Sequence, residues 1–164
     1  MKTKRTALIT GASSGLGVEY AKLCAADGHD VVLVARSEGK LRELASELSQ
    51  KHGITAHVYP ADLSRADGPR GLFDALARDG VTVDILVNNA GLGYVSDFRS
   101  STTASELEMV HVNVTALTEL THLFLPGMVA RRFGRVLNVA STAAFQGGPG
   151  MAVYFATKAY VVSF

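Results

Sequence analysis

A serine, a tyrosine and a lysine stand close together in the last part of the chain, at Ser141, Tyr154 and Lys158. Tyr154 and Lys158 are four residues apart, so on a helix the lysine ammonium lies on the same face as the tyrosine phenol. A free phenol is a poor base at neutral pH, and a nearby cation favours its ionised form. The pair is therefore suited to moving a proton to or from a bound oxygen atom. The plain alternative is that Tyr154 packs a helix and Ser141 caps a helix or a turn.

A glycine-rich turn near the start of the chain, Thr10-Gly11-x-x-x-Gly15-x-Gly17, lies between a short apolar run and a stretch of helical period. At such a strand-to-helix turn, backbone amides and the helix dipole hold a diphosphate, and glycine lets the phosphates approach the backbone. A flexible loop with incidental glycines is the alternative, and the position between strand and helix argues against it. We therefore expect a dinucleotide to contact these residues of the turn: Gly11, Ser13, Ser14, Gly15, Leu16 and Gly17.

The elements that position these residues follow a regular alternation of short apolar runs and longer helical patterns. Strands are predicted over residues 7–10, 31–35, 54–59, 83–87 and 135–139, and helices over 15–27, 38–52, 64–79, 102–132 and from 152 onward. Residues 31–34 are apolar at every position, as in strands covered on both faces of a parallel sheet. Without an internal repeat or a linker, the pattern predicts one doubly wound α/β domain over residues 1–164.

A charged residue at the end of the second strand indicates which dinucleotide is bound. Folds that bind NAD place an acidic residue here against the ribose 2′-hydroxyl, whereas a nearby arginine accommodates the 2′-phosphate of NADP. This chain has Arg36 at that position, and Asp30 precedes the strand and so lies at its opposite end. The sequence therefore favours NADP(H) over NAD(H), unless Arg36 is an ordinary solvated side chain.

Three motifs together resemble the short-chain dehydrogenase/reductase family. They are the Thr-Gly-x-x-x-Gly-x-Gly spacing of the first turn, Asn88-Asn89-Ala90-Gly91 after the fourth apolar run, and Tyr154-x-x-x-Lys158. The resemblance covers essentially the whole chain and implies a Rossmann-like parallel sheet with strand order 3-2-1-4-5. Relatives are longer, so it also implies that this chain is a fragment that ends within the helix carrying Tyr154 and lacks two further strands. The fifth strand, 135–139, would then be an uncovered edge.

The same resemblance implies roles for individual residues. Ser141 would hydrogen-bond the substrate oxygen, Tyr154 would exchange a proton with it, and nicotinamide would exchange a hydride with the carbon. Lys158 would also hold the ribose hydroxyls, and Asn113 would kink its helix and complete a proton relay through water. Among the remaining cofactor contacts, the family places the ribose and nicotinamide against Asn89, Ala90 and Gly91, and the adenine against Asp62 and Leu63.

Two of these residues have alternatives that the sequence leaves open. Asp62 precedes the predicted helix 64–79, so its carboxylate could cap that helix and contact adenine at the same time. Asn113 lies inside the predicted helix 102–132, where an asparagine is a poor helix former and a buried amide needs partners. Asn113 is therefore either a satisfied core amide or part of the relay.

The composition excludes several other classes of function. A net charge of +1 with no run of like charges provides no footprint for nucleic acid or for an anionic membrane surface. Cys24 is the only cysteine, and His111 and His122 have no shared metal-binding spacing, so neither a disulfide framework nor a metal site is expected. A hydrophobic share of 48% is ample for a core. With no targeting segment in the first residues, we expect a cytoplasmic protein.

The predicted function is an NADP(H)-dependent oxidoreductase that acts on a small carbonyl or secondary alcohol. By analogy with the family, a homodimer or homotetramer would form through the helices at 102–132 and from 152, and the 164-residue segment alone need not be active. A 3-oxoacyl reductase is the alternative within the family, slightly disfavoured by Ser14. A non-catalytic NADP-binding regulatory module is the alternative outside enzymes. A sugar-nucleotide epimerase is disfavoured by the glycine spacing.

Overall fold

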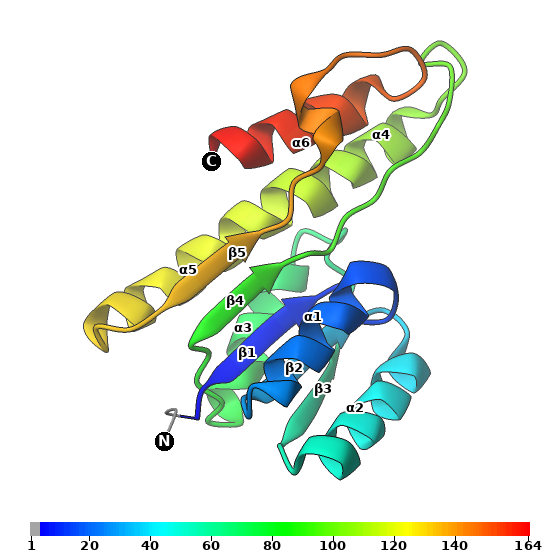
Figure 1. Cartoon of the computed structure of the whole chain (residues 1–164). Helices are drawn as coiled ribbons and strands as arrows, with labels where there is room; N and C mark the ends of the chain where they lie inside the picture. Colours follow the sequence, from blue (N-terminus) through cyan, green and yellow to red (C-terminus); the bar gives the residue numbers. More distant parts are fainter. Residues whose placement is uncertain (1–3) are drawn as a thin grey trace.

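The structure, a computed structural model, describes residues 4–164 and contains a parallel five-stranded sheet (Figure 1). The strand order is β3-β2-β1-β4-β5, which confirms the predicted doubly wound α/β topology. The strands are β1 (Thr6–Thr10), β2 (Asp30–Ala35), β3 (Ala56–Pro60), β4 (Ile85–Asn88) and β5 (Arg135–Asn138). The helices are α1 (Gly15–Ala26), α2 (Glu38–His52), α3 (Gly68–Arg78), α4 (Thr103–Val110), the π-helical η1 (His111–Ala116), α5 (Leu117–Ala130), the 3₁₀ turn η2 (Thr142–Phe145) and α6 (Ala152–Ser163).

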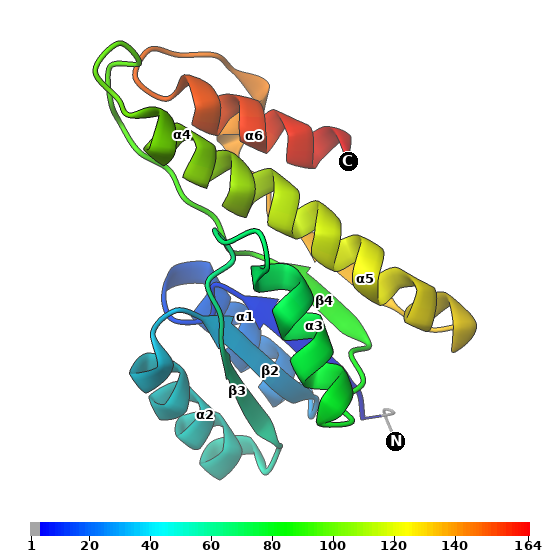
Figure 2. The same cartoon turned by 180° about the vertical axis from the view of Figure 1, so that it is seen from behind.

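Helices cover both faces of the sheet, as the continuous apolar runs predicted. The helices α1 and α2 lie on one face, and α3 and α5 lie on the other (Figures 1 and 2). Alternate residues of the central strands face opposite layers: Ile9 and Leu33 pack with the first pair of helices, whereas Leu8 and Val32 pack with the second pair. The last helix, α6, packs against α4, η1 and η2, beyond the ends of β4 and β5.

The predicted helix at 64–79 begins four residues later than expected, at Gly68. The Asp62 carboxylate accepts hydrogen bonds from the Ser64 amide (3.0 Å) and hydroxyl (2.7 Å), which holds this segment in a turn instead. Pro69 then stands in the first turn of α3, where its missing N–H costs nothing. The alternative in which Asp62 caps this helix is therefore wrong, because Asp62 orders the turn that precedes α3.

The predicted helix at 102–132 is not one regular helix. It consists of α4, the π-helical turn η1 and α5, and Asn113 lies within η1. Insertion of a π-helical turn widens the helix locally and is frequent at functional sites. The structure shows a π-helical turn at Asn113, and the kink that the family resemblance implies there stays a prediction.

The β5 edge carries partly exposed apolar side chains, Val136 and Leu137, as predicted for a strand with no neighbour on its outer side. Within residues 4–164, no helix is both long and apolar enough to cross a membrane. In the same part of the chain, no group of three or more acidic, histidine or cysteine side chains is placed to hold a metal ion.

Candidate cofactor and active site

A cleft of ≈ 630 Å³ lies at the carboxyl ends of the strands, where open α/β sheets bind their ligands. Every strand contributes a residue that directly follows its end, because parallel strands bring all these ends to one edge of the sheet. These residues are Gly11, Arg36, Ala61, Asn89 and Val139. Residues of α6 close the far side of the cleft. The predicted cofactor residues that line it are Gly11, Ser13, Ser14, Leu16, Arg36, Asp62, Leu63, Asn89, Ala90, Gly91, Tyr154 and Lys158.

The two remaining glycines of the turn, Gly15 and Gly17, shape the backbone and do not line the cleft. Gly15 opens α1 with a φ of 56°. A Cβ on Gly17 would overlap the carbonyl oxygen of Gly11 and lie 2.7 Å from the Asn89 amide nitrogen. Gly11 itself has a φ of 68° and has no room for a side chain, because its Cβ would lie 2.9 Å from the same nitrogen. The glycines therefore allow the first turn to pack closely against the segment that follows β4.

Thr10 joins the glycine turn to the Asn-Asn-Ala-Gly segment, which lies almost eighty residues away in the sequence. Its buried hydroxyl accepts hydrogen bonds from the backbone amides of Asn89 (3.0 Å) and Ala90 (2.9 Å) and donates one to the carbonyl of Val87 (3.2 Å). The Asn89 side chain in turn donates to the Thr10 carbonyl (2.9 Å). These hydrogen bonds join the two motifs at the base of the cleft.

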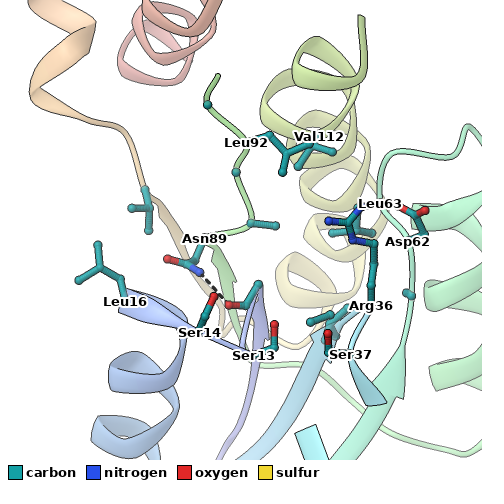
Figure 3. Close-up of a pocket in the computed structure, with 18 of the residues that line it drawn as sticks. Ser13, Ser14, Leu16, Arg36, Ser37, Asp62, Leu63, Asn89, Leu92 and Val112 are labelled. Atoms are coloured by element: carbon teal, nitrogen blue, oxygen red, sulfur yellow. Dashed lines mark hydrogen bonds between the residues drawn. The ribbon is translucent and has the colours of Figure 1, made fainter. Parts of the chain in front are cut away.

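Arg36 extends from the end of β2 into the cleft, towards Asp62 and Leu63 (Figure 3). Its side chain is 62% exposed, and one guanidinium nitrogen lies 3.7 Å from a carboxylate oxygen of Glu108. Hydrogen bonds from Ser64 and the charges of Arg36 and Arg65 hold the pKa of Asp62 below its usual range. Asp30 lies at the opposite end of the strand, where it pairs with Lys4, so Arg36 is the charge at the predicted 2′ position.

Tyr154 and Lys158 enter the same cleft from α6. Lys158 is only 5% exposed, and its ammonium donates a hydrogen bond to the Val139 carbonyl (2.9 Å) and lies 5.9 Å from the centre of the Tyr154 ring. Burial lowers the pKa of Lys158. The Tyr154 ring packs against Gly93, where a Cβ would lie 3.0 Å from a ring carbon. The predicted pairing of the two side chains on one helix face therefore exists.

Ser141 lies at the start of η2, next to the cleft residue Ala140, and is not itself one of the residues that line the cleft. Its hydroxyl oxygen accepts a hydrogen bond from the Ala143 amide (3.1 Å), so Ser141 does cap a turn. The hydroxyl proton is not used by that bond. The capping contact therefore orients the hydroxyl and leaves it able to donate to a ligand.

Asn113 is buried (1% exposed), and protein groups satisfy its side chain. Its amide nitrogen donates to the Leu92 carbonyl (2.8 Å) and the Thr157 hydroxyl (3.0 Å), and its oxygen accepts from the Leu92 amide (2.8 Å). A Cβ on Gly91 would lie 3.3 Å from the Lys158 ammonium and 3.4 Å from the Asn113 oxygen. Asn113 is thus a satisfied core amide that also borders Lys158, and its place in a proton relay stays a prediction.

Sequence reasoning did not single out Thr157, which the structure places between Asn113 and Tyr154. The buried Thr157 hydroxyl accepts from Asn113 and donates to the Tyr154 carbonyl (2.8 Å). The available signal was a polar residue directly before Lys158 in an otherwise apolar helix. Sequence reasoning also left several residues that line the cleft out of the cofactor site. They are Val34, Ala35, Ser37, Ala61, Leu92, Gly93, Val112, Val139, Ala140 and Met151.

Comparison with known proteins identifies the family to which the chain belongs. A family model described as short chain dehydrogenase matches residues 5–164, so the chain belongs to the short-chain dehydrogenase family. A short-chain dehydrogenase from Sphingobium yanoikuyae in complex with NADPH superposes with a TM-score of 0.91 at 38% identity, over 97% of this chain and 62% of that one. L-sorbose reductase from Gluconobacter frateurii, complexed with NADPH and L-sorbose, gives a TM-score of 0.92 at 31% identity, over 99% of this chain and 62% of that one.

Among curated proteins, the chain is 37% identical over 162 residues to the very-long-chain 3-oxoacyl-CoA reductase of Laccaria bicolor, over 96% of this chain and 47% of that protein. It is 34% identical over 162 residues to the 17-beta-hydroxysteroid dehydrogenase type 3 of Mus musculus, over 96% of this chain and 52% of that protein. The chain therefore spans about half the length of these relatives.

Proposed function

We propose that the protein is an NADP(H)-dependent oxidoreductase that interconverts a carbonyl compound and a secondary alcohol. The observation that carries the proposal is that Tyr154 and Lys158 open into the same cleft as the glycine turn. A general acid or base and a nucleotide cradle in one cleft are the two parts that such a reaction needs.

The residues of the cleft fit a dinucleotide. Gly11 and Gly17 have no space for side chains, and α1 begins at the cleft, so its free backbone amides are available for a diphosphate. The cleft volume of ≈ 630 Å³ lies within the range of small-molecule sites. When bound, the nicotinamide supplies or accepts the hydride.

The proton chemistry belongs to the residues at the α6 side. In the reducing direction, the Tyr154 hydroxyl gives its proton to the substrate oxygen while Ser141 donates a hydrogen bond to the same oxygen. No hydrogen bond occupies the Tyr154 hydroxyl within residues 4–164, so it is available to a ligand. The Lys158 ammonium stabilises the negative charge left on the phenol, and the Val139 carbonyl holds Lys158 in place. Alcohol oxidation uses the same groups in reverse.

The preference for NADP(H) rests on Arg36, which directly follows β2 and lines the cleft at the position where folds that bind NAD carry an acidic residue. Two structural relatives were solved with NADPH, which supports the same choice. Affinities for NADPH and NADH, measured before and after Arg36→Asp, test it. An unchanged ratio would remove Arg36 from the site.

A 3-oxoacyl thioester is the second candidate substrate, because the very-long-chain 3-oxoacyl-CoA reductase of Laccaria bicolor is among the relatives at 37% identity. A steroid or another bulky ketone is consistent with the hydroxysteroid dehydrogenase relative. All three substrate classes share the carbonyl on which Tyr154 would act, so the proposed proton chemistry is the same for each.

Two further expectations stay predictions. Association into a homodimer or homotetramer is supported by exposed apolar side chains on α5, Leu125 and Val129, and on α6 and the residue after it, Val162 and Phe164. Sedimentation analysis of the full-length protein tests it. A cytoplasmic setting rests on the single, half-buried Cys24, because disulfides are rare in reducing compartments.

Turnover separates an enzyme from a non-catalytic NADP-binding module. Full-length protein, NADPH and a panel of ketones and 3-oxoacyl thioesters should show loss of nicotinamide absorbance, and Tyr154→Phe should abolish it while NADPH still binds. Activity that survives Tyr154→Phe would refute the mechanism. Tight NADPH binding without turnover of any substrate would favour the module.

A further inference from the structure

The Arg36 guanidinium forms an ion pair with one carboxylate and interacts electrostatically with a second. Glu108 of α4 lies 3.7 Å from it, and the charge of Arg36 also acts on Asp62. One cation therefore faces two anions at the position where the 2′-phosphate of NADP is expected. Arg36 alone would make this part of the cleft positive, and the Glu108 and Asp62 carboxylates offset its charge.

Glu108 is itself held by a second contact. The Tyr94 hydroxyl donates a hydrogen bond to the other oxygen of its carboxylate (3.2 Å). Burial and the Glu108 charge raise the pKa of Tyr94, so Tyr94 stays a hydrogen-bond donor throughout the neutral range. Both oxygens of Glu108 thus have partners, one from the loop after β4 and one from the end of β2.

The ion pair joins the end of β2, which borders the cleft, to α4. Arg36 comes from the end of β2, and Glu108 lies one helical turn before Val112, which lines the opposite side together with Leu92 (Figure 3). Asp62 and Leu63, the residues expected to meet adenine, lie beside Arg36 (Figure 3). A nucleotide that carries a 2′-phosphate must take Arg36 from Glu108, whereas one with a free 2′-hydroxyl need not.

We propose that Glu108 is a specificity-determining residue that competes with the 2′-phosphate for Arg36 and so limits the preference for NADP(H) over NAD(H). This inference rests on the proposed function. The competition acts on one cofactor only, because NAD(H) has no group that needs Arg36.

The matched pair of variants is Glu108→Gln and Glu106→Gln. Both lie on α4 and remove one negative charge, and among the ion pairs within residues 4–164 only Glu108 is joined to Arg36. We expect Glu108→Gln to tighten NADPH about 2- to 5-fold and to leave NADH within about 2-fold, because an exposed ion pair is worth up to about 5-fold in affinity. Glu106→Gln should change both affinities equally. Binding is measured by titration calorimetry on the full-length protein, with 2′-phospho-ADP-ribose and ADP-ribose as probes without nicotinamide.

A double variant tests whether Glu108 acts through Arg36. In an Arg36→Gln background, the gain from Glu108→Gln should fall below about 2-fold, since there is no cation left to release. A weaker or unchanged NADPH affinity in Glu108→Gln, an equal gain for NADH, or a gain that persists without Arg36 would each overturn the inference. If the parent protein binds neither dinucleotide, the proposed function itself has failed.

Discussion

Replacing Thr157 with valine removes one hydroxyl from the buried contact between Asn113 and Tyr154 and keeps the shape of the side chain. Thr157 is 3% exposed, accepts a hydrogen bond from Asn113 (3.0 Å) and donates one to the Tyr154 carbonyl (2.8 Å). In the variant, the Asn113 amide nitrogen keeps its bond to Leu92 and loses its second partner. The substitution thus loosens the link between the loop after β4 and the helix that carries Tyr154.

The magnitude follows from the buried donor that is left without a partner. Such a group costs about 1–3 kcal/mol, and each kcal/mol lowers the melting temperature of a domain of this size by about 2–4 °C, so we expect a fall of about 2–12 °C. We also expect kcat to fall, because a loosened helix displaces the Tyr154 hydroxyl. A displacement of about 1 Å at a reacting group costs about 100-fold, so we expect a fall of about 10- to 100-fold.

Thr157→Ser is the matched control, because it keeps the hydroxyl and loses only a methyl group. Thermal unfolding and steady-state kinetics with NADPH are measured for both variants in the full-length protein. We expect the serine variant to keep kcat within about 3-fold of the parent, since both hydrogen bonds remain. If valine and serine variants have the same kcat, the hydroxyl does not position Tyr154 and the reasoning is wrong.

Two further substitutions test the cleft. Gly17→Ala should weaken NADPH binding at least 10-fold, because its Cβ would overlap the Gly11 carbonyl oxygen and force the turn to move; Gly39→Ala, where a Cβ meets open space, should leave binding unchanged in the same titration. Lys158→Met should abolish turnover. As the pH rises towards 10.5, the free energy of unfolding of the parent should increase relative to that of this variant, as measured by chemical denaturation. Burial lowers the pKa of Lys158 in the folded state below its ordinary value of 10.5. Between the two pKa values the unfolded state binds more protons than the folded state, so the stability of the parent rises with pH. A parent that loses stability relative to Lys158→Met over this interval would contradict the lowered pKa.

Much of the fold could be predicted from the sequence, because strand and helix periodicity is a local property of the chain. Residues 31–34 are apolar at every position, which predicted a strand covered on both faces, and the structure places β2 inside the sheet. The glycine turn, Asn-Asn-Ala-Gly and the Tyr-Lys pair are also local patterns. Parallel strands bring their carboxyl ends to one edge, so the meeting of these motifs in one cleft followed from the predicted topology.

Tertiary structure alone decided the contacts between segments that are distant in the sequence. Neither composition nor spacing indicates that Glu108 lies beside Arg36, or that Asn113 holds both backbone groups of Leu92. The start of α3 at Gly68 likewise depends on how Asp62 binds Ser64, a turn that competes with the helix. Sequence by itself therefore determined the fold class and the family, and it predicted the residues of the chemistry. Packing determined how those residues are held and which charged groups lie beside Arg36, because hydrogen bonds and ion pairs depend on distances that only the folded chain sets.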